Sequence, residues 1–113
     1  MADLKNKIVL ISGGARGIGA AISAAMAEAG AKVVISDLLE KEGENKVSEL
    51  LSQGHQASFI KHDVTDESEW KKTVSFCATT YGGLDVLVNN AGIYFTGPIE
   101  ETALEDWKKM FSV

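Results

Sequence analysis

The stretch SGGARGIG at residues 12–19 decides the fold of this chain. Its glycines have the spacing G-x-x-x-G-x-G, and it follows an apolar, β-branched run at residues 7–12. A first glycine lets the chain reverse sharply off a strand, while a later pair lets backbone approach a pyrophosphate and a helix pack closely on a sheet. The stretch therefore predicts a strand-to-helix turn that offers phosphates the N-terminus of a helix.

Two other phosphate-binding loops do not match this turn. Residues 14–19 have the outer glycine spacing of a Walker A loop, but Ala20 and Ala21 stand where Lys and Ser or Thr are required. The strict G-x-G-x-x-G of other dehydrogenases is also absent. The sequence gives no support for nucleotide triphosphate hydrolysis, and a plain tight turn remains the alternative to a dinucleotide site.

Outward from the turn, short apolar runs alternate with longer helical patterns, and glycines mark most boundaries. The predicted strands are residues 7–12, 32–36, 57–62 and 84–88. The predicted helices are residues 18–29, 40–53, 66 to about 81 and 102–113, with a loop at 89–98. We expect an α/β fold, a Rossmann-like doubly wound parallel sheet within one domain over residues 1–113, truncated after the fourth strand and the start of the fourth helix.

Asp37 ends the second predicted strand, about 20 residues after the glycines. A carboxylate there can accept hydrogen bonds from both ribose hydroxyls of an adenosine and repels a 2′-phosphate, so it favours NAD over NADP. The neighbouring Leu38 adds no cation, although Arg16 inside the turn is one and keeps NADP open as an alternative. Asp37 can also serve as the N-cap of the helix that begins near residue 40.

Asp63 and Val64 follow the third predicted strand. Ligands of open α/β sheets bind at the carboxyl ends of the strands, where an Asp can accept from an adenine amino group while Val packs on the ring. Asp63 can instead turn the chain before Thr65 and Asp66. Asp66 and Glu69 have the spacing of a capping box for the next helix.

Composition limits the classes of partner. The formal net charge is −5 and the 11 Lys and Arg residues are scattered, which argues against nucleic acid or an anionic membrane as a main partner. No secretory signal or membrane-spanning stretch is visible, so we expect a soluble, cytoplasmic protein. Cys77 is the single cysteine, expected as a buried thiol, and His55 and His62 lack partners at metal-ligand spacing, so we expect no metal site.

These motifs together resemble the short-chain dehydrogenase/reductase family. Residues 12–19 are similar to its T-G-x-x-x-G-x-G turn with Ser12 replacing Thr, residues 63–64 to its adenine-contacting pair, and residues 89–92 to its N-N-A-G motif. The resemblance covers the chain from residue 5 to 113. It implies a nicotinamide cofactor and hydride transfer between a secondary alcohol, such as a hydroxysteroid or a 3-hydroxyacyl compound, and its ketone. It also implies a homo-oligomer, a dimer or tetramer, for the full-length form.

Carried over by position, the resemblance assigns each candidate residue a part of the cofactor. The pyrophosphate and its ribose would lie against Gly13, Arg16, Gly17, Ile18 and Gly19, the adenosine ribose against Asp37 and Leu38, the adenine against Asp63 and Val64, and the nicotinamide ribose along Asn90, Ala91 and Gly92. Asn90 has a second reading, in which its side-chain amide ties the fourth strand to a neighbouring strand.

The family's chemistry uses a Tyr and a Lys four residues apart, a Ser and a fourth-helix Asn, and none of these has a counterpart here. Tyr81 is followed at that spacing by Asp85, and Tyr94 by Pro98. We therefore assign no catalytic residue and expect the chain alone to be inactive. A non-catalytic dinucleotide-binding or regulatory module is the alternative function. Because the family's sheet continues further, we also expect strand 84–88 to be left as an exposed apolar edge.

Overall fold

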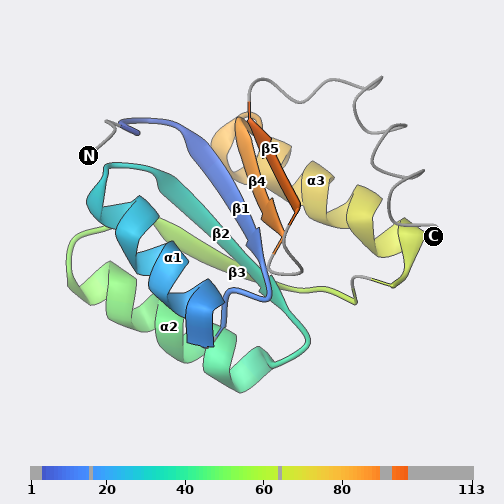
Figure 1. Ribbon diagram of the computed structural model, residues 1–113, viewed down its shortest axis with the longest axis horizontal. Coiled ribbons are helices and arrows are strands. Elements are labelled where there is room, and N and C mark those ends of the chain that lie inside the picture. Colours follow the sequence, from blue (N-terminus) through green and yellow to red (C-terminus); the bar gives the residue numbers. More distant parts are fainter. Residues whose placement is uncertain (1–3, 16, 64, 90–92, 97–113) are drawn as a thin grey trace.

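Five strands form one sheet in the order β3-β2-β1-β4-β5 in the computed structural model (Figure 1). The structure describes residues 4–15, 17–63, 65–89 and 93–96. The first four strands pair in parallel, and β5 pairs antiparallel with β4. The strands are β1 (Ile8–Ser12), β2 (Lys32–Asp37), β3 (Ala57–Lys61), β4 (Val86–Asn89) and β5 (Ile93–Thr96).

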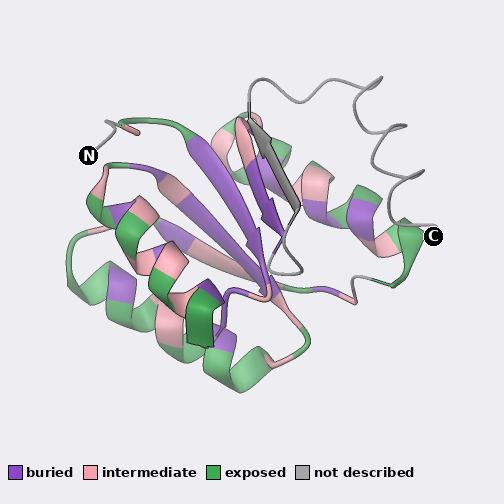
Figure 2. Cartoon of the chain, viewed as in Figure 1, coloured by how far each residue is buried: buried purple, intermediate pink, exposed green. Residues whose placement is uncertain are grey.

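Helices α1 (Gly17–Glu28) and α2 (Glu40–Ser52) cover one face of the sheet, and α3 (Glu67–Tyr81) covers the other (Figure 1). Successive residues of a strand point to opposite faces, so a continuous apolar strand contributes side chains to the hydrophobic layers on both faces of the sheet. In β1, Ile11 packs in the cluster on the side of α1 and α2, whereas Leu10 packs in the cluster with Trp70 and Cys77 of α3. Figure 2 shows the resulting buried centre of the sheet.

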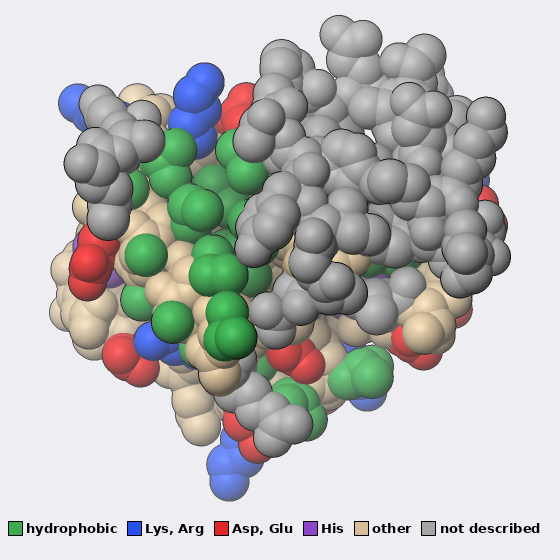
Figure 3. All heavy atoms as spheres, viewed as in Figure 1, with side chains coloured by type: hydrophobic (Ala, Val, Ile, Leu, Met, Phe, Trp, Pro, Cys, Tyr) green, Lys and Arg blue, Asp and Glu red, His purple; other side chains and the backbone are tan. Residues whose placement is uncertain are grey.

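Helix α1 differs from the other two in having almost no charge. Its sequence GIGAAISAAMAE holds one ionisable residue, Glu28. Figure 3 shows hydrophobic side chains gathered on the face of the molecule where α1 lies in Figure 1. By contrast, α2 has acidic residues in its first turn and keeps Leu50 as its buried apolar side chain.

The predicted parallel α/β core is confirmed, with element ends that differ by two residues at most among the described strands and helices. One prediction about the sheet is wrong. Residues 93–96 fall in the stretch predicted as a loop, yet they form β5 and cover the edge of β4 that was expected to be exposed. The segment IYFT is β-branched and aromatic, and an antiparallel partner needs only a short connection. The fourth helix predicted at 102–113 lies outside the described residues.

Helix boundaries agree with the glycine signals but not with every predicted cap. Helix α3 begins after Asp66, whose carboxylate accepts from the Ser68 N–H at 2.9 Å, and ends at Gly82 in the left-handed region (φ 93°). The capping box is only half formed, because the Glu69 carboxylate accepts from the Asp63 N–H (3.1 Å) rather than from Asp66. The N-cap of α2 is Leu39, so the prediction of Asp37 in that role is wrong.

Candidate functional site

The glycine turn lies at the carboxyl end of β1 and is fixed by the end of β2. Gly13 adopts a positive φ of 68°, and its N–H donates to the Ser36 carbonyl at 2.7 Å. The Gly14 N–H points to the same carbonyl at 3.4 Å. The chain therefore reverses directly off the central strand, as the first glycine of the motif predicts.

Gly19 and Gly17 meet two different requirements. A Cβ at Gly19 would overlap the carbonyl oxygen of Gly13, so only glycine allows the first turn of α1 to pack this closely on the loop. Gly17 has nothing within 4 Å of a built Cβ but adopts a φ of 61°. The helix thus starts beside open space, and this space stays empty because residue 17 has no side chain.

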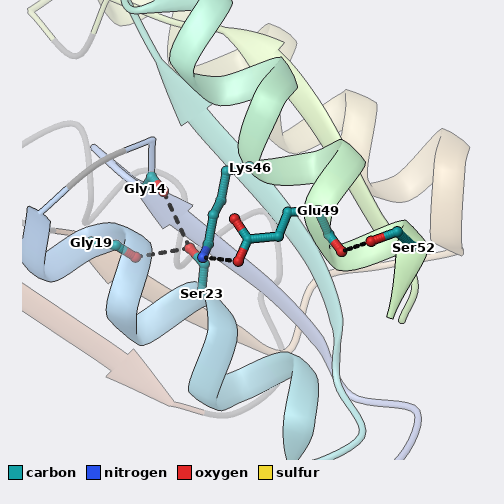
Figure 4. A network of polar contacts seen from close by, with 6 residues as sticks. All are labelled: Gly14, Gly19, Ser23, Lys46, Glu49 and Ser52. Atoms are coloured by element: carbon teal, nitrogen blue, oxygen red, sulfur yellow. Dashed lines mark hydrogen bonds and ion pairs between the residues drawn. The ribbon is translucent and has the colours of Figure 1, made fainter. Parts of the chain in front are cut away.

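Ser23 joins the loop to α1 from inside the helix (Figure 4). Its hydroxyl donates to the Gly19 carbonyl at 2.8 Å and lies 3.5 Å from the Gly14 carbonyl oxygen, and the side chain is fully buried. Because the hydroxyl contacts a carbonyl of the helix (Gly19) and a carbonyl of the loop (Gly14), it holds the first turn of α1 against the loop. The first N–H groups of a helix have no acceptor within the helix itself.

The charge at this helix start suits an anion. The first turn of α1 contains no acidic residue. Free N–H groups and the helix dipole give such an end a partial positive charge, and no carboxylate on the first turn offsets it. Two apolar side chains beside the same edge are unusually exposed: Ile18 at 73% and Leu38 at 56%. The edge therefore offers both an anion site and an apolar surface.

Asp37 is tied to the glycine turn itself. Its Oδ2 accepts from the Ala15 N–H at 3.2 Å, and its Oδ1 accepts from the Leu39 N–H at 3.0 Å. The carboxylate is half-buried at the end of β2. The structure thus brings Asp37 and the glycine turn together.

Asp63 is partly used by its own loop. Its Oδ1 accepts from both the N–H and the hydroxyl of Thr65, at 2.9 and 2.6 Å. The side-chain bond from Thr65, followed by its backbone bond, lowers the pKa of Asp63. The turn-forming reading of this residue is therefore confirmed. Both bonds end on Oδ1, and no described donor contacts Oδ2.

Four buried polar side chains form a row beneath this edge, on the face that α3 covers. Ser12 donates through its hydroxyl to Asn89 Oδ1 at 3.1 Å, joining β1 to β4. Ser36 Oγ lies 3.1 Å from His62 Nδ1, joining β2 to the residue after β3. The family motifs include Ser12 and Asn89 of this row, whereas sequence reasoning did not single out Ser36 and assigned His62 no metal-binding role. Parallel register is the signal that aligns Ser12 with Ser36 and Asn89.

Five predicted site residues lie outside the described part of the chain, so their positions stay predictions: Arg16, Val64, Asn90, Ala91 and Gly92. Among the residues that are described, no group of His, Cys, Asp and Glu could hold a metal ion. None of the described helices is long and apolar enough to cross a membrane.

The chain is similar in sequence to known proteins. The family model for short chain dehydrogenase matches residues 7–113. The chain is 44% identical over 110 residues to the 2,5-dichloro-2,5-cyclohexadiene-1,4-diol dehydrogenase LinX of Sphingobium indicum, covering 97% of this chain and 44% of that protein. It is also 44% identical to a 3-alpha-(or 20-beta)-hydroxysteroid dehydrogenase of Mycobacterium tuberculosis, covering 97% of this chain and 41% of that protein.

A solved structure agrees with the fold. The crystal structure of hydroxysteroid dehydrogenase from Escherichia coli superposes with a TM-score of 0.75 at 35% identity, over 79% of this chain and 38% of that one. The chain thus spans less than half the length of the curated relatives it matches.

Proposed function

The chain belongs to the short-chain dehydrogenase family, and on that premise we propose that it forms the cofactor-binding, N-terminal part of a single NAD-binding domain. The proposed reaction of the whole protein is hydride transfer between a secondary alcohol and its ketone. The nicotinamide, when bound, supplies the hydride acceptor or donor. The residues of this chain bind and orient the dinucleotide.

One observation carries the proposal: the Asp37 carboxylate and the glycine turn form a single unit. The 3.2 Å bond from the Ala15 N–H holds the carboxylate beside the helix N-terminus, where the pyrophosphate of a dinucleotide would bind. A ribose bridging these two groups would meet a negative charge that repels a 2′-phosphate. The geometry therefore supports NAD rather than NADP.

We assign the remaining cofactor contacts from the positions of residues relative to the glycine turn and Asp37. Open space at Gly17 leaves room for the pyrophosphate, and the exposed Leu38 can cover one face of the adenosine. The proposed cofactor-binding set is Gly13, Arg16, Gly17, Ile18, Gly19, Asp37, Leu38, Asp63, Val64, Asn90, Ala91 and Gly92.

The substrate class follows from the named relatives. One is a hydroxysteroid dehydrogenase, and a cyclopentanol dehydrogenase of Comamonas testosteroni is 38% identical over the whole of this chain. Cyclopentanol and the 3-alpha position of a steroid carry a secondary hydroxyl on a ring, whereas the 20-beta hydroxyl is a secondary hydroxyl on the steroid side chain. We propose a cyclic secondary alcohol as the substrate of the whole protein, which we expect to be a homo-oligomer.

A non-catalytic dinucleotide-binding module is a second candidate, and the position of Tyr81 favours it for the 113-residue chain. The Tyr81 hydroxyl lies 2.8 Å from Ser58 Oγ, near the start of β3, and Lys32 lies 5.9 Å from the ring centroid. This tyrosine faces the amino ends of the strands, away from the glycine turn. No described side chain is placed to give a proton to a substrate at the cofactor edge.

Cofactor binding tests the proposal. We expect the chain to bind NAD more tightly than NADP, and Asp37→Asn to shift that preference toward NADP by about tenfold, because it removes the charge and keeps a carbonyl acceptor. Glu28→Gln is the matched control, since it removes one carboxylate at the far end of α1. Equal preference in the wild type and Asp37→Asn, measured by calorimetry, would contradict the role of Asp37.

The two candidate functions are separated by turnover and by the coding DNA. We expect the purified chain to bind NAD without producing NADH from cyclic alcohols. NADH formation by this chain would show that it contains the proton-transfer group. A Tyr-x-x-x-Lys encoded beyond Val113 would support the oxidoreductase, whereas a stop codon there would support the module.

A further inference from the structure

His62 is a buried histidine whose backbone is joined to both residues whose carboxylates are proposed to face the adenosine, Asp37 and Asp63. It follows β3 directly, is 1% exposed, and its backbone N–H donates to the Asp37 carbonyl at 3.0 Å. Asp63 is the next residue. A displacement of the His62 backbone therefore moves the Asp63 loop and strains the backbone bond to the strand end that carries Asp37.

Two elements, β2 and α3, hold the His62 ring. Its Nδ1 lies 3.1 Å from Ser36 Oγ of β2, and its centroid lies 4.3 Å from that of Trp70 on α3, with the rings at 90°. Nε2 is buried and has no hydrogen-bond partner among the described residues. A buried ring nitrogen without an acceptor cannot carry a proton at low free-energy cost, so this niche fits the neutral imidazole.

Burial and nearby carboxylates act in opposite directions on the pKa of His62. Burial lowers the pKa of His62 below its ordinary value of 6.5, and this effect outweighs the attraction of Glu69, Asp63 and Asp66, which raise it. From β2, the Asp37 carboxylate is directed to Ala15 and Leu39 rather than to the imidazole. The folded chain therefore takes up this proton less readily than an exposed histidine does.

We propose that His62 is a positioning residue whose neutral ring locks the adenosine side of the cofactor edge, and that its protonation releases this lock and weakens dinucleotide binding. The inference rests on the proposed NAD site. A charged ring must leave the niche of Ser36 and Trp70 to reach water, and it draws the end of β3 with it. Binding and protonation then oppose each other, so NAD must lower the affinity of His62 for protons.

The test uses the full 113-residue chain and NAD⁺ as the probe. Its two histidines are His55 and His62, so the His55→Asn variant leaves one imidazole signal to follow by NMR. His55 lies in the loop before β3, at the opposite end of the sheet from the glycine turn. We expect the His62 signal to titrate below pH 6.5 and to shift to lower pH when NAD⁺ is added.

Affinity for NAD⁺ is measured in parallel from about pH 7.5 to about pH 5. In the wild type and in His55→Asn, we expect the affinity for NAD⁺ to decrease as the pH is lowered, by at most about tenfold per pH unit for one proton. In His62→Asn, which keeps a group able to bond Ser36 and cannot titrate, this fall should disappear. Absence of NAD⁺ binding at pH 7.5 would overturn the proposed function and this inference together.

Other results would overturn the inference alone. The first is NAD⁺ binding with the same pH dependence in the wild type and His62→Asn. The second is an imidazole titration in His55→Asn that NAD⁺ leaves unchanged, which needs no substitution at His62 and so stands even if His62→Asn fails to fold.

Discussion

Gly19 illustrates how single residues determine the shape of the glycine turn. Its missing Cβ makes room for the Gly13 carbonyl, whereas Gly17 is required by its backbone conformation. Sequence spacing assigned the first glycine to the reversal off the strand but gave the later pair a joint role, so it did not separate Gly17 from Gly19. The distinction depends on how α1 packs on the loop, which is visible only in the folded chain.

Substitutions separate the two reasons. We expect Gly19→Ala to lower the free energy of unfolding by about 1–3 kcal/mol through overlap with the loop. Gly17→Ala should cost about 1–2 kcal/mol through its positive φ. Asn tolerates positive φ, so Gly17→Asn should regain part of the loss and Gly19→Asn should not. Urea denaturation measures all four variants, and a Gly19→Ala variant as stable as the wild type would refute the packing argument.

At the scale of elements, α2 and β3 approach each other through Gly43, the fourth residue of α2. A Cβ at Gly43 would overlap the ring of Phe59. Helix propensity alone predicts that Gly43→Ala stabilises α2 by about 1 kcal/mol. The contact with Phe59 reverses that sign, because the ring must move out of its packed position.

We therefore expect Gly43→Ala to destabilise the chain by about 1–3 kcal/mol. In a Phe59→Leu background the same substitution should cost at least about 1 kcal/mol less, because the smaller side chain leaves space. Ser48→Ala, on the exposed side of α2, controls for helix propensity. If Gly43→Ala has the same effect in both backgrounds, measured by thermal unfolding, the steric explanation is wrong.

At the scale of the whole molecule, stability should decrease from the centre of the sheet outward. All five residues of β1 are buried between two neighbouring strands, whereas β5 is an edge strand with one partner. Cys77 is fully buried under the same core, and burial raises the pKa of its thiol to about 12. The β1 amides and the Cys77 thiol should become accessible to solvent only when the core opens.

Two measurements check this gradient. We expect β1 amides to exchange with solvent through global unfolding and β5 amides through smaller openings. We expect Cys77 to react with a thiol reagent only at the opening rate of the core. A Ser75→Cys thiol in a Cys77→Ser background, on the exposed side of α3, should react at once. Equally fast reaction of the Cys77 thiol would contradict a closed core.

The sequence by itself determined the features that depend on neighbouring residues: the glycine turn, the parallel strands and helices, their glycine ends, and the residue types expected at the cofactor edge. Local conformation and side-chain periodicity encode these directly. The tertiary structure alone decided the pairing of β5 with β4, the bond between Asp37 and Ala15, and the burial of His62 against Ser36 and Trp70. The Asp37–Ala15 and His62–Ser36 contacts join residues more than 20 positions apart in the chain, and all of these contacts depend on which surfaces folding brings together.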